Sequence, residues 1–439
     1  MSTEPAELRR ALGWPSIAAY GLGAILGAGI YSVIGAAAGE VGASMWLAFL
    51  ISAVVAMVTA FAYAELATMF PRAGGEFLYV HHALPKAGSV SFTVGTMMVV
   101  SAAATAATVA VAFSGYLSAL VEVPGVAAAI ALVVVLALVA IVGVRESTWM
   151  VAAFTMIEAA GLIIVVYLGA TDERFGEALV SVPTPNVLAG AALVFFSYLG
   201  FENIVNLAEE TRRPERDLPR AIIVSLVVAT ALYILVALAV VALTPPAELA
   251  RSGEPLAHAV RARSPSLAGA LGGIALFATA NTAMAALVSG SRILYAMAGA
   301  GKMPAVFARV ARKRRTPWVA TLVVMAGGLA LLPLGRIAVI AGLSSFVSLL
   351  AFGTVNLALV ILRKRDPQRR RPFRVPGAIR GVPVLPVVGM VLAFGLVTQL
   401  ETRVIATGAL IVAGALVLHF VGHRVRRAGL ATTRSVPAK

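Results

Sequence analysis

The sequence contains no cysteine and only five histidines among its 439 residues. Without cysteine the chain has no disulfide bonds and no thiol chemistry, and its histidines lie outside any metal-ligand spacing. Charged residues are also scarce: they make up 13% of the chain, whereas a soluble domain has about 25%. This composition excludes an ordinary soluble protein and gives no reason to expect a metal or another cofactor.

What fills the chain instead is long stretches without charge. Eleven stretches of at least 20 residues carry no Asp, Glu, Lys or Arg, and a twelfth, 147–171, is interrupted only by Glu158. About 20 apolar residues in a helix cross a hydrocarbon core of about 30 Å, whereas a transmembrane barrel would show alternating segments of about 10 residues. We therefore predict an all-α integral membrane protein. Its twelve spans lie at about 14–39, 43–68, 88–118, 124–144, 148–169, 186–207, 219–243, 267–298, 317–334, 337–362, 383–400 and 403–423.

The basic residues are placed unevenly between the predicted connections. With the N-terminus in the cytoplasm, the inner segments hold 28 Lys and Arg residues and the outer segments hold 6. The positive-inside rule predicts such a split, and the opposite topology would invert it. The net charge of +15 is therefore an orientation signal and a contact with anionic lipid, not a nucleic-acid footprint. We expect a multi-pass protein of the cell membrane with both termini in the cytoplasm.

Two of the predicted spans contain glycine near their middle. The first has Gly21, Gly23, Gly27 and Gly29, and the sixth has Gly200. Each begins a group of five spans, 14–169 and 186–362, and two further helices follow at 383–423. Glycine-interrupted spans at corresponding places of two halves are typical of inverted repeats with a central binding site. We predict one polytopic domain over 1–439 that contains these two repeats.

Opening a helix at membrane depth leaves amide and carbonyl groups unpaired, which costs several kcal/mol for each group in lipid. Such breaks persist where they line a cavity. Free N–H groups at a half-helix start attract a carboxylate, and free C=O groups attract an ammonium, so two facing breaks suit an amino acid. The alternative is close helix packing, for which Gly23 and Gly27 have the right spacing. The matched pair, with an acid just after the second glycine, favours the broken helices.

Several motifs follow one another along the chain. The first span contains Gly-Leu-Gly-Ala-Ile-Leu-Gly-Ala-Gly-Ile-Tyr (21–31), and the second ends in Tyr-Ala-Glu-Leu (63–66) before Pro-Arg-Ala-Gly-Gly-Glu (71–76). The sixth contains Phe-Ser-Tyr-Leu-Gly-Phe-Glu (196–202), which leads into Glu-Glu-Thr-Arg-Arg-Pro-Glu-Arg-Asp-Leu-Pro-Arg-Ala-Ile (209–222). Ala-Thr-Ala-Asn-Thr (278–282), Ser-Arg (291–292) and Pro-Phe-Arg-Val-Pro (372–376) come later. Over essentially the whole chain, this order resembles the amino acid–polyamine–organocation (APC) superfamily of permeases.

The resemblance implies a LeuT-like core of five plus five inverted helices, with two extra helices at the C-terminus. It implies that Ile25 lies at the substrate site, that the amides around Gly27, Ala28, Gly29 and Ile30 hold the substrate carboxylate, and that the carbonyls of Phe196, Ser197 and Leu199 hold its amino group. Phe201 resembles the aromatic gate that closes the site from outside.

One position departs from the family. In several proton-coupled relatives the fifth helix carries a lysine whose ammonium takes a sodium-like place, and the corresponding residue here is Glu158. The lysine mechanism therefore does not carry over. A carboxyl group in apolar surroundings favours its protonated form, so Glu158 is a candidate proton carrier. Ionised, it could instead hold a cation or the amine of a cationic substrate, and the third reading is a protonated, hydrogen-bonded glutamate with no transport role.

Other polar residues have two readings each. Glu202 either anchors the helix that re-forms after Gly200 or touches the substrate. Glu65 and Glu76 are interpreted as interfacial residues paired with Arg72 or another inner arginine. In span eight, the polar residues either line the coupling-ion region or join helices through hydrogen bonds; they are Thr279, Asn281 and Thr282.

The sequence thus predicts a secondary active transporter that moves an amino acid or related amine by alternating access, proton-coupled or exchanging, with protons or Na⁺ as coupling ion. A polyamine or organocation carrier of the same fold is the nearest alternative, and a transporter-like sensor or channel is the alternative from another class. An enzyme is disfavoured because no histidine lies in mid-span and no His-Glu-x-x-His or Gly-x-Ser-x-Gly motif is present. The absence of a Gly-x-x-x-x-Gly-Lys-Ser/Thr motif argues against ATP as the direct energy source.

Overall fold

The structure is a computed structural model that describes residues 12–71, 75–143, 148–180, 184–208, 210–311, 314 and 316–434. Most of the predicted spans correspond to one long helix each. These helices are α3 (Met45–Met69), α5 (Gly88–Ser118), α6 (Gly125–Val142), α7 (Thr148–Ala170), α10 (Pro214–Leu243), α13 (Pro265–Gly299), α14 (Trp318–Leu331), α15 (Ile337–Arg365), α16 (Val384–Val397) and α17 (Thr402–Arg434).

The first and sixth predicted spans are each divided. The first consists of α1 (Trp14–Leu26) and α2 (Ala28–Val41), and the sixth consists of α9 (Val187–Val194) with the 3₁₀ helices η2 (Phe195–Tyr198) and η3 (Phe201–Leu207). Short elements join the spans: η1 (Gly42–Ser44), α4 (Gly75–Ala83), α8 (Phe175–Leu179), α11 (Pro246–Arg251), α12 (Pro255–Arg261), η4 (Ala305–Ala308), η5 (Leu332–Leu334), β1 (Ala378–Ile379) and β2 (Val382–Pro383).

Within the described residues, nine helical stretches are long and apolar enough to cross a membrane. Trp14–Met69 counts once among them although it contains α1, α2 and α3, while Trp318–Leu334 and Val384–Val397 are shorter apolar helices. An integral membrane protein made of helices is confirmed. The number twelve and the inverted repeats stay predictions that this arrangement fits.

Proline and serine mark where several helices begin. Pro214, Pro246, Pro255 and Pro265 each stand in the first turn of a helix, where the missing N–H leaves no bond unmade. Ser264 also caps α13, because its hydroxyl accepts from the N–H of Leu267 at 3.4 Å. The connection between α10 and α13 is therefore a small helical cap formed by α11 and α12.

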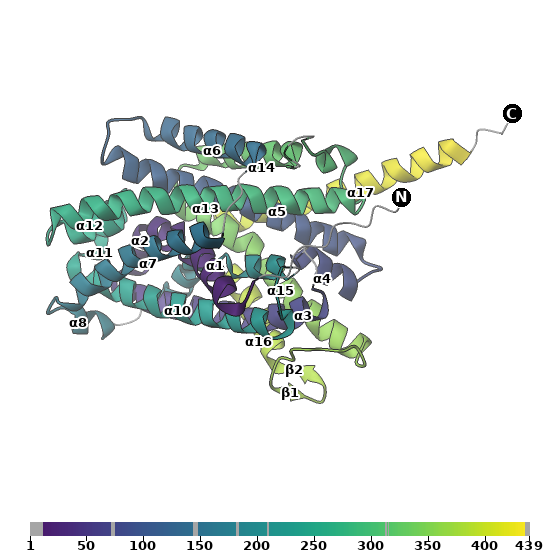
Figure 1. Cartoon of the computed structure of the whole chain (residues 1–439), viewed down its shortest axis with the longest axis horizontal. Coiled ribbons are helices and arrows are strands. Elements are labelled where there is room, and N and C mark those ends of the chain that lie inside the picture. The colour runs from purple at the N-terminus through teal and green to yellow at the C-terminus, as the bar shows by residue number, and fades with distance from the viewer. Residues whose placement is uncertain are drawn as a thin grey trace.

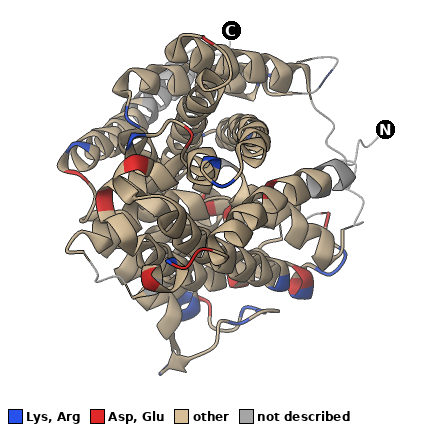
Figure 2. Cartoon of the chain, turned by 90° about the vertical axis from the view of Figure 1, so that its left-hand side faces the viewer, with Lys and Arg blue, Asp and Glu red and all other residues tan. Residues whose placement is uncertain are grey.

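The long helices lie roughly along one common axis, and short helices cover their ends. Figure 1 shows α10 and α13 along the horizontal axis, with α8, α11 and α12 at the left end and the end of α17 at the right. Figure 2 looks onto the left end, where acidic and basic positions are interspersed. Leu12 bonds to Glu210 and Arg212 through backbone groups, at 3.0 and 2.9 Å, which joins the start of α1 to the loop before α10.

The basic, proline-containing stretch 363–382, which begins in the last turn of α15, is only partly exposed to solvent. Val375 is buried, and its N–H donates to Glu65 Oε2 at 2.8 Å. Arg363 is buried as well and donates to both oxygens of Glu65, with Nε to Oε1 at 3.0 Å, while Arg371 Nε lies 3.3 Å from Oε1. The basic residues of this segment thus split into a buried set that binds α3 and an exposed set.

Candidate functional site at two broken helices

Gly27 interrupts the first predicted span. Its backbone, at φ −29° and ψ −136°, is not helical, and its N–H donates to the carbonyl of Gly23 at 3.0 Å, which ends α1. α2 then starts at Ala28, so the N–H groups of Ala28, Gly29 and Ile30 have no carbonyl one turn earlier in their own helix. The predicted break is confirmed, and its first amides are those that the sequence indicates.

Leu199 and Gly200 interrupt the sixth predicted span. Leu199 is extended, at φ −63° and ψ 137°, and Gly200 has φ 129°, a conformation that suits glycine. Glu202 fixes this turn because its Oε2 accepts from the N–H of Gly200 at 2.7 Å. Of the two roles predicted for Glu202, the geometry shows the anchoring one.

The two breaks are in direct contact. A methyl group added to Gly29 would lie 2.7 Å from Cα of Ser197, and one added to Gly200 would lie 2.4 Å from the carbonyl oxygen of Ala24. Only residues without a side chain allow backbones to approach so closely. The glycines therefore allow both the close packing of the two spans and the breaks in their helices, so the two interpretations of the sequence hold together.

Tyr233 of α10 connects the breaks, and sequence reasoning did not identify it. Its hydroxyl lies 2.5 Å from the carbonyl oxygen of Ile25 and 3.1 Å from that of Ser197, so it can donate to either. The ring is fully buried against Phe49 and Tyr198. No sequence motif marks a single tyrosine in an apolar span. The only signal was that the unpaired carbonyls at both breaks need a hydrogen-bond donor.

Several of the predicted backbone ligands already have partners. The N–H of Gly27 is bonded to the carbonyl of Gly23 at 3.0 Å in this conformation, so its role toward a carboxylate stays a prediction. The carbonyl of Phe196 accepts from the N–H of Leu199 at 3.2 Å, and the carbonyl of Ser197 faces Tyr233. A carbonyl has two lone pairs, so these two oxygens keep one acceptor position each. The hydroxyl of Ser197 is buried without a partner.

Glu158 of α7 faces α13 beside the first break. The side chain has no exposed surface, and its Oε1 accepts from Asn281 Nδ2 at 3.2 Å, while Oε2 has no hydrogen-bond partner among the described residues. Tyr31 of α2 donates to the backbone carbonyl of Glu158 at 2.9 Å. Within the described chain, no Lys, Arg or His forms an ion pair with this carboxyl group.

The other two predicted residues of span eight lie differently. Thr282 is adjacent to the first break, since a methyl group on Gly27 would lie 2.2 Å from its Oγ1. Thr279 is buried and donates to the carbonyls of Ala275 and Leu276 in its own helix, at 2.7 and 3.0 Å. The structure thus brings Asn281 and Thr282 to the break, whereas the hydroxyl hydrogen of Thr279 is used within α13.

An aromatic group, Tyr63, Phe195, Phe201 and Phe352, closes one side of the breaks. The ring of Phe201 lies 5.5 Å from that of Tyr63 and 5.3 Å from that of Phe352. α3 contacts α11 through η1 at its start and ends at Met69, so Tyr63 lies on the side away from the α11 and α12 cap. With both termini in the cytoplasm, which stays a prediction, this side is the inner one, and the position of Phe201 beside Tyr63 and Phe352 then does not fit an outer gate. Phe196, by contrast, packs with Val33 of α2 and Val109 of α5.

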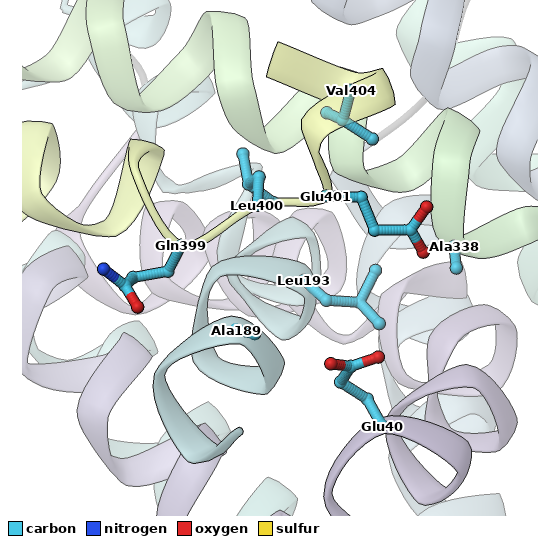
Figure 3. A pocket seen from close by; sticks show the side chains of 8 residues that line it. All are labelled: Glu40, Ala189, Leu193, Ala338, Gln399, Leu400, Glu401 and Val404. Carbon is cyan, nitrogen blue, oxygen red and sulfur yellow. The ribbon is translucent and has the colours of Figure 1, made fainter. Parts of the chain in front are cut away.

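Two cavities open on the side of the cap. The larger, of about 440 Å³, reaches Tyr31 and Ser32, one turn past the first break, and is bordered by Glu40, Arg336 and Glu401. The smaller, of about 120 Å³, lies next to it, and Figure 3 shows the carboxyl groups of Glu40 and Glu401 on opposite sides of it. A polar route therefore leads from the cap toward the breaks, while the aromatic group closes the other side.

The two glutamates at the end of span two have separate surroundings. Glu65 pairs with Arg363 and Arg371, which confirms the predicted pairing with an arginine; that this side is the inner one stays a prediction. Glu76 pairs with no arginine that the structure describes: its Oε1 accepts from the hydroxyl of Tyr63 at 2.9 Å, and the side chain is buried. Arg72, the other predicted partner, lies outside the described residues.

Comparison with known proteins finds a family model and several relatives along nearly the whole chain. The family model described as amino acid permease matches residues 12–421. An uncharacterised transporter of Mycobacterium tuberculosis is 31% identical over 92% of this chain and 89% of its own. The branched-chain amino acid permease BcaP of Bacillus subtilis is 26% identical over 90% of this chain and 89% of its own, and the methylthioribose transporter of the same organism is 29% identical over 87% and 86%.

Proposed function

Because this chain belongs to the amino acid permease family, a family of transporters and not of enzymes, we propose that it moves an amino acid or a related amine across the cell membrane by alternating access. The observation that carries this proposal is the contact of the two broken helices. Gly29 meets Ser197 and Gly200 meets Ala24, so a half-helix start and a set of interrupted carbonyls stand side by side. A zwitterion matches both.

In this proposal the carboxylate of the substrate binds the amides of Ala28, Gly29 and Ile30, which begin α2. Its ammonium group binds the carbonyls of Phe196, Ser197 and Leu199. Tyr233 holds the two breaks together when no substrate is bound, because its hydroxyl reaches a carbonyl in each. Ile25 and Ile30 are fully buried next to these groups and help to exclude water.

Access comes from the side of the α11 and α12 cap. The cavity of about 440 Å³ reaches Tyr31 and Ser32 from that side, while Tyr63, Phe201 and Phe352 close the other. With both termini in the cytoplasm, as the distribution of Lys and Arg favours, the structure corresponds to a conformation closed toward the cytoplasm. Rocking of one five-helix repeat against the other would exchange the open side.

Coupling is proposed to occur through a proton at Glu158. The buried carboxyl group has one neutral donor, Asn281, and one oxygen without a partner. Removing a carboxylate from water without a positive partner is costly, so the protonated form suits this place. Tyr31 of α2 donates to the backbone carbonyl of Glu158, and Asn281 of α13 donates to its side chain, which links the proton to the half-helix after the first break.

The test is uptake into proteoliposomes, with twenty amino acids, common polyamines and methylthioribose offered under separate proton and sodium gradients. At least one amine is expected to move, and a proton gradient is expected to increase its uptake. Glu158→Gln should remove the pH dependence and leave substrate binding intact. Uptake that follows only sodium, or an unchanged pH dependence in the variant, would contradict the proton role; no amine bound or moved would contradict the transport proposal.

A further inference from the structure

A short hairpin lies beside the helical bundle, between α15 and α16. Its strands β1 and β2 pair Ile379 with Val382. Arg380 and Gly381 form the turn between them and have positive φ, 50° and 83°, as a type I′ turn requires. Figure 1 shows the hairpin outside the outline of the long helices, and a methyl group added to Gly377 or Gly381 would meet no described atom within 4 Å. The hairpin therefore faces whatever surrounds the bundle.

We propose that this hairpin binds the headgroups of anionic phospholipids at the membrane surface. In this proposal Ile379 enters the apolar boundary of the lipid, and Arg374 and Arg380 bind the phosphates. The proposal needs only that the chain spans a membrane, and it does not depend on the transport function. With the orientation that the distribution of Lys and Arg predicts, the lipids are those of the inner leaflet, whose surface is negative.

The end of the hairpin is apolar. Ile379 has 68% of its surface exposed, and its cross-strand partner Val382 is partly exposed. A single exposed isoleucine is common in soluble proteins, but this one precedes a helix that itself exposes apolar residues. α16 begins at Val384, and its Val388 and Val391 are exposed. In a membrane protein such residues face lipid, so the hairpin stands where the lipid-facing surface of α16 begins.

The length of α16 places the hairpin at the level of the lipid headgroups. The helix has 14 residues and is therefore about 21 Å long. The hydrocarbon core is about 30 Å thick, so α16 falls short of it by about 9 Å. The residues that flank α16, with the hairpin on its N-terminal side, then lie at the boundary of the core. Isoleucine is stable at this depth, and an arginine there can extend its charged end to the phosphates.

The two arginines of the proposed site have no counter-charge within the protein. The stretch 363–382 contains eight basic residues and one acid. Four of its arginines pair with acids: Arg363 and Arg371 with Glu65, Arg369 with Asp366, and Arg370 with Glu215. Arg374 and Arg380 are exposed, and neither forms an ion pair with a described residue. Anionic lipid supplies the charge that these two arginines lack.

The buried part of the same segment fixes the place of the hairpin. The N–H of Val375 donates to Glu65 Oε2 at 2.8 Å, and the N–H of Val384 donates to the carbonyl of Gly377 at 2.9 Å. Arg374 directly precedes Val375, so its backbone is held at the end of α3. The apolar tip and the arginines are thus presented by an ordered backbone, which favours a lipid site over a polybasic tail.

The chain has no cysteine, so a single introduced cysteine can carry a nitroxide spin label at the hairpin. Ile379→Cys would be labelled and placed in lipid nanodiscs of phosphatidylcholine alone or of an equal mixture with phosphatidylglycerol. The measurement is the accessibility of the label to oxygen, which concentrates in the bilayer, and to a neutral nickel chelate, which stays in water. Gln368→Cys, at an exposed position of the same connection, is the reference.

In the mixed lipid, the ratio of oxygen to nickel accessibility at Ile379→Cys is expected to exceed that at Gln368→Cys several-fold. The ratio at the hairpin should also be several-fold higher in the mixture than in phosphatidylcholine alone. Equal ratios at the two positions would overturn the proposal. Protection of Ile379→Cys from both reagents would overturn it as well, because a second copy of the chain would then cover the hairpin.

The role of the arginines is tested in the same labelled protein. Arg374→Gln with Arg380→Gln should remove the effect of phosphatidylglycerol on the ratio. Arg369→Gln with Arg370→Gln is the matched control, because it removes the same charge from arginines that pair with acids of the protein, and it should leave most of the effect. Equal results for the two double variants would contradict a site at the hairpin. No substrate is needed, so these results are independent of the uptake experiment.

Discussion

Glu65 in α3 and Glu158 in α7 are both glutamates without any exposed surface, yet their surroundings are opposite. Glu65 accepts from the guanidinium of Arg363 and the N–H of Val375, and Arg371 Nε lies 3.3 Å away. Glu158 accepts from one neutral amide, that of Asn281, and its second oxygen has no partner. Two arginines pair with the carboxylate of Glu65, whereas none of the described Lys, Arg or His residues forms an ion pair with Glu158.

The difference separates a structural acid from one suited to transport. A buried carboxylate is tolerated when cations and hydrogen bonds replace the water that it lost, as they do around Glu65. These partners attach the end of α15 and the segment after it to the end of α3, so the role of Glu65 is to hold these elements together. A buried carboxyl group without a cation is stable when it carries a proton, and it can change state when water reaches it. Glu158 has this second property.

The largest expected effect comes from breaking the paired acid. Glu65→Gln leaves the buried Arg363 and the largely buried Arg371 without their counter-charge, and we expect a loss of about 3–5 kcal/mol in the free energy of unfolding. Thermal unfolding of the purified protein in detergent measures this. Glu215→Gln is the matched control, because Glu215 meets the exposed Arg370 at 3.5 Å and should change stability by about 1 kcal/mol or less. Equal effects of the two substitutions would remove the distinction drawn above.

The second-largest effect is expected at the hydroxyl of Tyr233, a neutral buried group that has hydrogen-bond partners. Tyr233→Phe removes the hydroxyl that reaches the carbonyls of Ile25 and Ser197 and leaves a buried acceptor unpaired, at about 1–3 kcal/mol. We therefore expect Tyr233→Phe, like Glu65→Gln, to lower the thermal stability. Saturating substrate should restore part of this loss, because the substrate binds the same two breaks. Tyr198→Phe is the control, since its hydroxyl donates to the carbonyl of Phe49 in α3 and to neither of the two carbonyls that Tyr233 reaches. If substrate restores the thermal stability of neither variant, or of both equally, Tyr233 has no role at the substrate site.

These two groups also show where sequence reasoning ends. The spans and the breaks at Gly27 and Gly200 could be predicted, because apolar length and glycine at membrane depth are local properties. The partner of Glu65 could be predicted only as some inner arginine, since Arg363 lies 298 positions along the chain. Tyr233 could not be predicted, because its role depends on where two distant carbonyls come together.

The departures from these expectations have a common physical origin. Resemblance assigns Phe201 to the outer gate, but its side of the break follows from how η3 packs on Tyr63 and Phe352. The segment 363–382 reads as solvated because it is basic, yet Arg363 and Val375 are buried where a single acid binds both. Burial of charge depends on a partner from another helix, and one sequence does not name that partner.

The smallest expected effect is at the unpaired acid. Glu158→Gln keeps an oxygen that can accept from Asn281 and removes only a proton that the apolar surroundings hold in place, so we expect the free energy of unfolding to change by about 1 kcal/mol or less. The measurement is the same thermal unfolding, made at several pH values. Wild type should lose stability relative to the variant as the pH rises, because the carboxyl group then tends to ionise without a counter-charge, while the amide of the variant stays neutral. A loss as large as that of Glu65→Gln, with no dependence on pH, would mean that Glu158 is a structural acid after all.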